Sequence, residues 1–445
     1  MNYYLLLKKQ AASLGEKPFL YMDEEIYSYD DFYRVVEERA GELPDFLGND
    51  LQSASVLAAA SSFFEQAVLF FALQKLAVRP ILLHHGLTQE DVEGIAEANG
   101  LQALVSLTAS EISCKRFPHE ARQHESADCL GVLSSGTTGV PKVMYRTFES
   151  WAGFFPVQNK IFGVGKAARL FLHGSLSFTG NLNAFLAALF AGASVCTSEY
   201  TGVKAWRSVI ENHAADTIYL VPAKLRLLME ASEKPLLGMK SMFAGSQLIS
   251  AALLQLLRER LPNAAIFLYY GASELNYITY TRCEDSGRDP NNLGKPFPGV
   301  KVSTLDGSIY VDTPFHVSGI AMPFTLHDRG RLNEHGELIF EGREQAWVNK
   351  GGFKISLARV EMKLREIAGV RDAAVLAVED DLRGAELAAF LVVADEAEKK
   401  AVRRAVRRVL LPVEMPRVLR FCTEIPLNDR GKVAKDILLQ KISAL

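Results

Sequence analysis

Cysteine is scarce in this chain of 445 residues, and its few copies lie far apart. The five cysteines are Cys114, Cys129, Cys196, Cys283 and Cys422, so none belongs to a Cys-x-x-Cys pair. This spacing excludes the common zinc and dithiol redox motifs, and the composition excludes a disulfide-stapled miniprotein. Scattered thiols are typical of a reducing compartment, so we expect a cytoplasmic protein.

The chain also lacks an excess of charge of one sign and a long uninterrupted apolar run. Its 49 Lys and Arg residues nearly balance 52 Asp and Glu residues, which leaves a formal net charge of −3. Such a balance gives no support for a nucleic-acid partner or a polybasic membrane surface. The apolar stretch at 56–83 is interrupted by polar residues, and that at 184–196 is too short to cross a bilayer, so we expect no membrane span.

What the chain does contain is a regular alternation of strand-like and helix-like segments. Before residue 150, the predicted strands 55–60, 79–83 and 103–106 alternate with the predicted helices 29–43, 63–76 and 89–99. The alternation continues to about residue 269 and favours a parallel sheet wrapped by helices. Short segments between 301 and 340 predict antiparallel strands. The last hundred residues or so can fold as a small α+β unit, with a hinge predicted at 342–345.

One segment between two strand-like runs is rich in small polar residues. It consists of Ser134, Ser135, Gly136, Thr137, Thr138 and Gly139, and Lys142 follows shortly after. Hydroxyls and unobstructed backbone N–H groups suit phosphate oxygens, and the lysine adds positive charge. The spacing differs from the Gly-Lys loop of the common NTPases. From composition alone, a flexible Ser/Gly-rich hairpin is an equal alternative.

This segment resembles the phosphate loop of the adenylate-forming superfamily, which includes acyl-CoA synthetases, aryl-CoA ligases, adenylation domains of peptide synthetases and luciferases. Further matches follow in the family's order from about residue 10 to the C-terminus. The resemblance implies an α/β fold. A large N-terminal adenylation domain of layered mixed sheets and helices would span residues 1–343, and a small mobile α+β domain would span residues 344–445.

A second segment resembles the family's nucleotide turn. It consists of Tyr269, Tyr270, Gly271, Ala272, Ser273 and Glu274. The resemblance implies that an aromatic ring stacks on adenine, that the hydroxyl contacts the α-phosphate and that Glu274 binds Mg²⁺. Chemistry agrees, because a carboxylate beside a triphosphate is repulsive unless both share a hard cation. The alternative is an ordinary strand-to-helix turn with the glutamate at a helix start.

Other matches complete the nucleotide site that the resemblance implies. Gly245, Ser246 and Gln247 look like the Gly-rich strand end that lies against adenine. Asp328 would accept hydrogen bonds from the ribose hydroxyls, although Leu326 and His327 replace the Thr and Gly that the family usually has there. Arg343 would contact ribose or phosphate. An ordinary turn aspartate is the alternative for Asp328.

The segment around the acid pocket resembles that of members that do not activate amino acids. The implied pocket residues are His173, Phe178, Thr179, Asn181 and Ala272. Amino-acid-activating relatives usually carry Asp after the Phe, where this chain has Thr179. An uncharged acyl or aryl group is therefore favoured, while simple core packing of these residues is the alternative.

The C-terminal part resembles the family's hinge, thiol tunnel and catalytic lysine. Gln345 stands where the hinge residue is commonly Asp or Lys, and Lys350, Gly351 and Gly352 resemble the loop beside the pantetheine tunnel. Lys432 would pair with the substrate carboxylate and the α-phosphate, with Thr138 and Glu274 as further catalytic residues. Lys435 is a nearby lysine to which the resemblance assigns no role.

The resemblance implies an ATP- and Mg²⁺-dependent ligase that activates a small-molecule carboxylic acid as acyl-AMP, releases pyrophosphate and passes the acyl group to coenzyme A, a reaction of fatty acid metabolism. The C-terminal domain would rotate between the two half-reactions. A separate acyl carrier protein is the alternative acceptor. A nucleotide-binding regulator without catalysis is a third reading, which the retained Glu274, Asp328, Arg343 and Lys432 disfavour.

Overall fold

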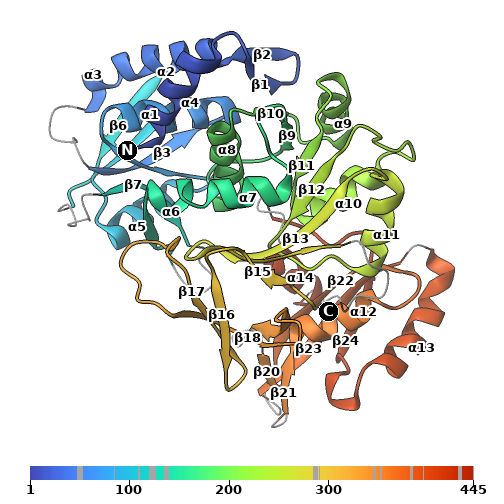
Figure 1. Ribbon diagram of the computed structural model, residues 1–445. Helices are drawn as coiled ribbons and strands as arrows, with labels where there is room; N and C mark the ends of the chain where they lie inside the picture. Colours follow the sequence, from blue (N-terminus) through green and yellow to red (C-terminus); the bar gives the residue numbers. More distant parts are fainter. Residues whose placement is uncertain are drawn as a thin grey trace.

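The computed structural model describes residues 1–445 except 48–53, 85, 109–110, 120–126, 135–139, 284–288, 290, 344–346, 351–352, 381–383, 394, 429–432 and 444–445. Within the described residues, two large sheets and one smaller sheet build a large N-terminal domain, and two further sheets build a small C-terminal domain. Figure 1 shows the small domain in orange and red below the two large sheets. The expected α/β architecture of one large and one small domain is confirmed.

The larger sheet carries the segments that the sequence singled out. Its order is β15 (Lys295–Pro296), β14 (Asn276–Arg282), β13 (Ala265–Ala272), β12 (Ser241–Ala244), β11 (Thr217–Tyr219), β9 (Arg169–Leu172), β10 (Ser194–Thr197), β1 (Pro18–Met22) and β2 (Glu25–Ser28). The strands from β13 to β1 are parallel, as expected. At the edges β2, β14 and β15 pair antiparallel, so the sheet is mixed.

The second sheet is formed by the first part of the chain. Its order is β6 (Ile112–Arg116), β5 (Ala103–Leu107), β3 (Ser55–Ala60), β4 (Arg79–Leu82), β7 (Asp128–Leu133) and β8 (Val143–Thr147). The four inner strands are parallel, while β6 and β8 pair antiparallel at the edges. The hairpin of β7 and β8 flanks the predicted phosphate loop.

Helices fill the space between the two sheets and cover their outer faces. The helices of this domain are α1 (Tyr3–Leu14), α2 (Tyr29–Glu42), α3 (Pro44–Leu47), α4 (Phe63–Lys75), α5 (Gln89–Asn99), α6 (Glu149–Ala152), α7 (Phe155–Phe162), α8 (Thr179–Ala191), α9 (Val203–Asn212), α10 (Pro222–Glu230) and α11 (Ala251–Arg260). Helix α4 contacts β3 and β4, whereas α8 contacts β9 and β10 and also α1. These helices are therefore the layer that joins the sheets (Figure 1).

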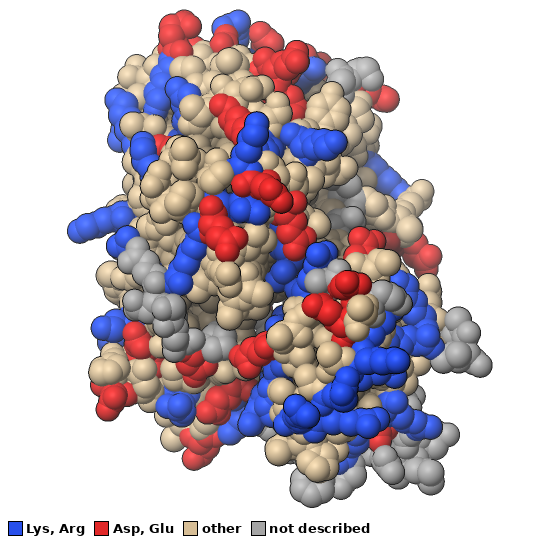
Figure 2. All heavy atoms as spheres, turned by 90° about the vertical axis from the view of Figure 1, so that its right-hand side faces the viewer, with Lys and Arg blue, Asp and Glu red and all other residues tan. Residues whose placement is uncertain are grey.

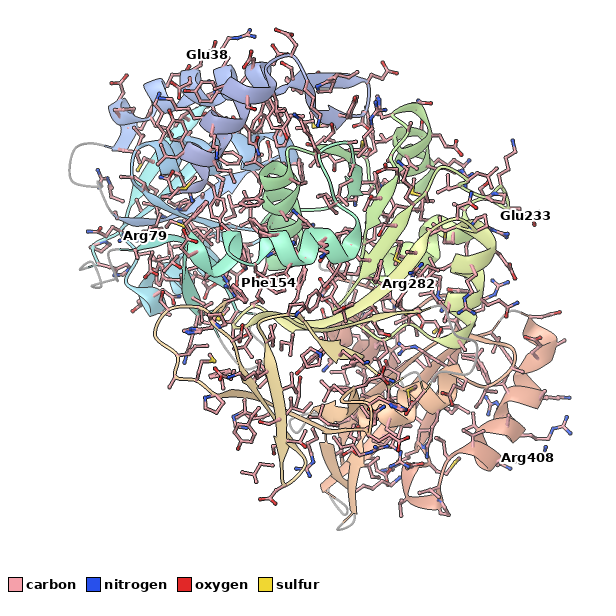
Figure 3. The ribbon with its side chains drawn as sticks, viewed as in Figure 1. Glu38, Arg79, Phe154, Glu233, Arg282 and Arg408 are labelled. Carbon is pink, nitrogen blue, oxygen red and sulfur yellow. The ribbon has the colours of Figure 1, made fainter. Side chains whose placement is uncertain are left out.

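Strand β3 shows how the sequence specifies this layering. Val56, Ala58 and Ala60 belong to the main core between the sheets, while Leu57 faces a separate cluster with Ile95 of α5. Successive side chains of a strand point to opposite faces, so an uninterrupted apolar run indicates a strand that is covered on both sides. Figure 3 places Phe154 well inside the large domain, where its ring is fully buried.

The remaining chain forms an antiparallel sheet and then the small domain. The antiparallel sheet, which the sequence predicted, consists of β16 (Lys301–Leu305), β17 (Ser308–Asp312), β18 (Phe324–Leu332) and β19 (Leu338–Arg343). The small domain contains β20 (Trp347–Lys350), β21 (Phe353–Ser356), α12 (Leu357–Arg365), β22 (Val370–Asp380), β23 (Gly384–Val393), the 3₁₀ turns Glu396–Glu398 and Pro412–Glu414, α13 (Lys399–Val409), β24 (Val418–Cys422) and α14 (Lys435–Ser443). Strand β24, which the sequence analysis missed, pairs in parallel with β23.

The apolar cores separate near the end of β19. The main core extends to Leu338, and the cores of the small domain begin at Val348. The boundary at 343/344 itself stays a prediction. In Figure 2, Lys and Arg gather over the lower lobe, which contains the small domain, and in Figure 3 Arg408 of α13 points away from the protein. Among the described residues, no helix is long and apolar enough to cross a membrane.

Candidate active site

The candidate site lies where the parallel strands of the larger sheet end. His173 follows β9, Val221 follows β11 closely, Ser246 follows β12 and Ser273 follows β13. Because the carboxyl ends of parallel strands meet at one edge of a sheet, these segments come together there. A cavity of about 160 Å³ lies at this edge, and all four of these residues line it. Three segments that the sequence singled out separately therefore share one cavity.

The described residues on either side of the predicted phosphate loop lie at the facing ends of β7 and β8, beside this cavity. Leu133 pairs with Val143 in the ladder. Beyond this pair, the Ser134 N–H donates to the Lys142 carbonyl, and the Lys142 N–H donates to Ser134 Oγ, each at 2.9 Å. Leu133 and Pro141, at either side of the loop, line the cavity. The side chain of Lys142 is exposed. Hydrogen bonds thus tie together the described residues at the base of the loop, next to the cavity.

The turn after β13 is anchored by a buried arginine. Arg146 of β8 has no exposed surface, and its guanidinium donates to the carbonyls of Ser273 (2.7 Å) and Phe315 (3.1 Å) and to Ser150 Oγ. Burial lowers the pKa of Arg146 to about 10, although the charges of neighbours that include Glu274 act in the opposite direction. Arg146 therefore fixes the backbone from which Glu274 projects.

Ser273 lines the cavity, and Glu274 is the next residue of the turn. The Ser273 hydroxyl donates to Thr179 Oγ1 at 3.0 Å, which joins the turn to the acid-pocket segment. The carbonyl of Glu274 accepts a hydrogen bond from the Val317 N–H at 2.9 Å. The Glu274 side chain is half-buried. A carboxylate oxygen at this place is a donor of the hard type that Mg²⁺ prefers.

Tyr270 and Asp328 come together although 58 residues separate them. The Tyr270 hydroxyl donates to Asp328 Oδ2 at 2.6 Å, and Asp328 is only 2% exposed. In the β18–β19 ladder, Asp328 stands opposite Arg343. Next to it His327 has a φ of 56°, a left-handed conformation that costs a residue with a Cβ about 1 kcal/mol or more. This explains why a glycine suits that position.

Tyr269, the other tyrosine of the turn, lies in the core. Its ring is 4.0 Å from that of Tyr277 between centroids, its hydroxyl contacts the Tyr219 hydroxyl at 3.0 Å, and burial raises its pKa. A Cβ on Gly245 would lie 2.3 Å from the Tyr269 ring, so only glycine fits at this strand end. Ser246, which follows, is exposed with a φ of 70°, and Gln247 is half-buried. Of the two tyrosines, Tyr270 is the more accessible.

The lining of the cavity also contains a histidine–lysine pair. Lys224 Nζ donates to the carbonyl of His173 at 3.1 Å and lies 3.3 Å from its Nδ1, while His173 Nε2 lies 3.2 Å from the Tyr200 carbonyl. Burial, and then the charge of Lys224, lower the pKa of His173 to about 3. His173 is therefore a neutral imidazole at physiological pH.

Three of the four other predicted pocket residues line the same cavity. Phe178, Thr179 and Asn181 line it, and Asn181 Nδ2 also donates to the Ser175 carbonyl at 3.0 Å. Ala272 is half-buried at the end of β13, paired with Asn276, and Gly271 precedes it in the same strand. The pocket segment is therefore a wall of a real cavity.

Part of the predicted site falls outside the described residues: Ser135, Gly136, Thr137, Thr138, Gly139, Gln345, Gly351, Gly352, Lys432 and the side chain of Arg343. Lys350, the described member of the predicted tunnel, is 12% exposed and pairs with Glu386 at 2.8 Å within the small domain. Its Nζ also donates to the Met415 carbonyl at 2.7 Å. In this structure Lys350 stabilises the small domain.

Two cations at the site, Arg146 and Lys224, were missed by the sequence analysis. Arg146 belongs to a strand-like run and Lys224 to an amphipathic helix, where basic residues are usually solvated. In the structure each lies over a tryptophan, Arg146 over Trp151 at 5.0 Å and Lys224 over Trp206 at 5.8 Å. No local signal in the sequence distinguishes them, because their burial depends on contacts with distant segments.

Two family models match the chain on either side of the predicted domain boundary. The model described as AMP-binding enzyme matches residues 129–320, and that described as AMP-binding enzyme C-terminal domain matches residues 359–432. Among curated proteins, the uncharacterized acyl-CoA ligase YhfT of Bacillus subtilis is 26% identical over 68% of this chain and 66% of its own length. The putative long chain fatty acid-CoA ligase VraA of Staphylococcus haemolyticus is 24% identical over 98% of this chain and 96% of its own.

Solved structures of low sequence identity share the whole fold. The o-succinylbenzoate CoA synthetase MenE of Bacillus subtilis, solved with an acyl-adenylate intermediate, has a TM-score of 0.82 at 20% identity, with 97% of each chain covered. The amide bond synthetase McbA of Marinactinospora thermotolerans has a TM-score of 0.82 at 21% identity, with 99% of each chain covered. With both family models matched in order, the chain belongs to the AMP-binding, adenylate-forming enzyme family.

Proposed function

We propose that this protein is an AMP-forming acid–thiol ligase that converts a small carboxylic acid into its CoA thioester through an acyl-adenylate. The observation that carries the proposal is the convergence of the phosphate-loop base, the strand end at Ser246 and the turn at Ser273 on one cavity. The acyl-CoA ligase names of YhfT and VraA, the latter aligned over nearly its whole length, support the same activity.

The nucleotide would bind on the side of Ser246, Tyr270 and Asp328. The Tyr270 hydroxyl orients Asp328, whose carboxylate would accept hydrogen bonds from the ribose hydroxyls. The loop 134–142 would hold the phosphates through backbone N–H groups and Lys142. Glu274 would bind Mg²⁺, and its carboxylate suits this ion. When bound, Mg²⁺ would neutralise phosphate charge.

The acid would occupy the cavity with its carboxylate toward Ser273. In the first half-reaction a carboxylate oxygen attacks the α-phosphorus, the bond to the β-phosphate oxygen breaks, and pyrophosphate leaves. In the second a thiol attacks the acyl carbon, AMP leaves, and the thiol proton passes to solvent. Both carboxylate and phosphate are anions, so Lys432 would stabilise the charge that develops during the first step.

Coenzyme A is the acceptor that we favour, since the relatives named above are CoA ligases. An acyl carrier protein is the second candidate. The basic helix α13, with Lys399, Lys400, Arg403, Arg404, Arg407 and Arg408, gives the small domain a surface that suits an acidic acceptor of either kind. A role in fatty acid metabolism and a place in the cytoplasm remain predictions.

Mass spectrometry of the products from MgATP, CoA and a panel of acids tests the proposal. Formation of an acyl-CoA with AMP and pyrophosphate is the expected result, and acyl-AMP alone would identify a carrier protein as the missing acceptor. Lys432→Ala should abolish acyl-AMP formation while leaving thioester formation from supplied acyl-AMP largely intact. Lys435→Ala is the matched control, and equal losses in both variants would contradict the role given to Lys432.

A further inference from the structure

Helix α13 presents a dense group of cations on the outside of the small domain. It contains no acidic residue, and its basic residues are Lys399, Lys400, Arg403, Arg404, Arg407 and Arg408. All of them are exposed except Lys399, which is half-buried. In Figure 2, Lys and Arg gather over the lobe that contains this helix. The nearly balanced charge of the whole chain therefore conceals a local excess of positive charge.

The apolar side of α13 is already used inside the small domain. Val402 and Val406 belong to its core and are 1% and 0% exposed. Residues four apart lie on the same side of a helix, so the cations form two adjacent rows on the side away from these valines. The row from Lys400 to Arg408 rises by about 12 Å. The helix therefore packs on the domain with its charged side toward solvent.

The cations of this outer face are not neutralised by the part of the chain that the structure describes. Within that part, none of Lys400, Arg404, Arg407 and Arg408 pairs with a carboxylate, and the Arg404 Nε–H reaches only the Lys400 carbonyl at 3.5 Å. In Figure 3, Arg408 points away from the protein. These four side chains keep their full charge available to a partner outside the domain.

The pattern of the cations works against the stability of the helix that carries it. Lys400 and Arg404 lie four residues apart, as do Arg404 and Arg408, and like charges at this spacing repel. Positive charge is favourable only near the C-terminus of a helix, so Lys400 in the first turn gains nothing from the helix dipole. A local pattern that opposes its own element is typical of a functional surface.

The composition of the face indicates the kind of partner. Apart from the cations, α13 contains only alanine and valine, so the face has no aromatic side chain at its centre. Protein interfaces usually have aromatic or other large anchors there, and lysine is depleted from them. A bilayer with anionic lipids instead offers a diffuse plane of phosphates, which attracts clusters of Lys and Arg on amphipathic helices. An anionic membrane therefore suits this face better than a protein does.

We propose that α13 binds the small domain to the surface of a membrane that contains anionic lipid. Because Val402 and Val406 are held in the core, the contact is electrostatic, without insertion of an apolar helix face. Salt should therefore weaken it. The proposal goes beyond the acid-activating function proposed above and does not depend on it. Where both hold, the ligase stays at the surface in which apolar acids collect.

Sedimentation with lipid vesicles tests the proposal. Vesicles with equal parts of phosphatidylcholine and phosphatidylglycerol are compared with pure phosphatidylcholine vesicles, without ATP or acid. We expect the wild type to bind only the anionic vesicles. The double variant Arg404→Gln, Arg408→Gln should lose about 25-fold in the partition coefficient, because each cation near the surface contributes about fivefold. The control Lys8→Gln, Lys9→Gln, on the exposed side of α1, removes the same charge and should bind as the wild type does.

Other outcomes would overturn the proposal. Equal binding to both kinds of vesicle, or equal losses in the α13 variant and the α1 control, would exclude a lipid site on this face. A marked loss of thermal stability in the α13 variant would show that the cations serve the helix itself, since removal of like charges should leave it at least as stable. Unchanged vesicle binding with weaker thioester formation from supplied acyl-AMP and CoA would assign the face to the thiol acceptor.

The same variant separates this inference from the proposed function. Acyl-AMP formation without vesicles should be equal in the wild type and in Arg404→Gln, Arg408→Gln. Vesicle binding that depends on α13, in a protein that activates no acid, would support the membrane site and overturn the ligase. Acid activation in a protein that binds no vesicles would overturn the membrane site alone.

Discussion

The two domains hold their buried or half-buried cations in different ways. In the large domain, the buried Arg146 hydrogen-bonds neutral carbonyl and hydroxyl groups and lies over a tryptophan ring. In the small domain, Lys350 pairs with Glu386, Lys363 with Glu414, and Arg365 with both Glu361 and Asp372. A cation paired with a carboxylate has its charge cancelled locally, whereas one held by dipoles keeps a field that acts on a bound anion. The large domain is where anionic substrates would bind.

Removal of Arg146 should have the largest effect. Arg146→Met would leave the buried carbonyls of Ser273 and Phe315 without this donor, at a cost of about 3–5 kcal/mol in the free energy of unfolding. Adenylation should fall further than stability alone explains, because the backbone at Glu274 loses its anchor. Urea unfolding and ATP–pyrophosphate exchange at a temperature where the variant is folded measure the two effects. An active, fully stable variant would refute the anchoring role.

Breaking the Lys350–Glu386 pair should have the next largest effect and should be confined to stability. Lys350→Met leaves a carboxylate that is 1% exposed without its ammonium partner, which we expect to cost about 3 kcal/mol. The double variant Lys350→Met, Glu386→Leu should recover most of that loss, since two apolar groups need no counter-charge. Acyl-AMP formation should be unchanged in the double variant. If the double variant were no more stable than the single one, the ion pair would not be the cause.

His173 should make the large domain sensitive to acid in a way that the ion pairs do not. Its folded pKa of about 3 lies below the ordinary value, so the unfolded chain takes up a proton first as the pH falls. The contribution of neutral His173 to the free energy of unfolding is complete above about pH 6.5 and decreases below it. At pH 5 the decrease amounts to about 2 kcal/mol. The stability gap between the wild type and His173→Asn should narrow accordingly between pH 7 and pH 5. A gap that is independent of pH would show that His173 titrates normally.

Removal of an exposed ion pair should have the smallest effect on the free energy of unfolding. Arg39 and Glu42 pair at 2.7 Å on α2, with 34% and 49% of their side chains exposed. Water screens such a pair, so Arg39→Ala should change the free energy of unfolding by about 0.5 kcal/mol or less. Thermal unfolding measures this directly. If Arg39→Ala lost more than about 1 kcal/mol in the free energy of unfolding, exposure to water would not explain why this pair differs from the buried ones.

Local signals predicted many of the elements well. Helix α5 begins and ends where expected, because Thr88 and Asp91 form a capping box and Gly100 supplies a left-handed cap. Strand β3 was likewise recognised from its apolar run. Helix α1 begins at Tyr3 because Asn2 caps it by accepting a hydrogen bond from the Leu5 N–H. Strand β24 was missed since its stability depends on pairing with the distant β23.

The candidate site was predictable only where residue types carried chemistry in a short span. Ser134, Glu274 and Asp328 were singled out because short motifs around them resemble those of a known family, since serine and aspartate alone are also common in ordinary turns. Lys224 lies 51 residues from His173 in the chain, and Arg146 lies 127 residues from Ser273. Their roles depend on how the sheet brings strand ends together, which the tertiary fold decides.

The register of Asp328 opposite Arg343 has a mechanical consequence. Arg343 is the last residue of β19 and stands directly opposite Asp328, the carboxylate that we expect to hold the ribose. If the small domain begins where we predict, its rotation would act on Asp328 through this pair of residues and on Tyr270 through the 2.6 Å hydrogen bond. We therefore expect a rotation of the small domain to change how tightly the predicted ribose site holds the nucleotide.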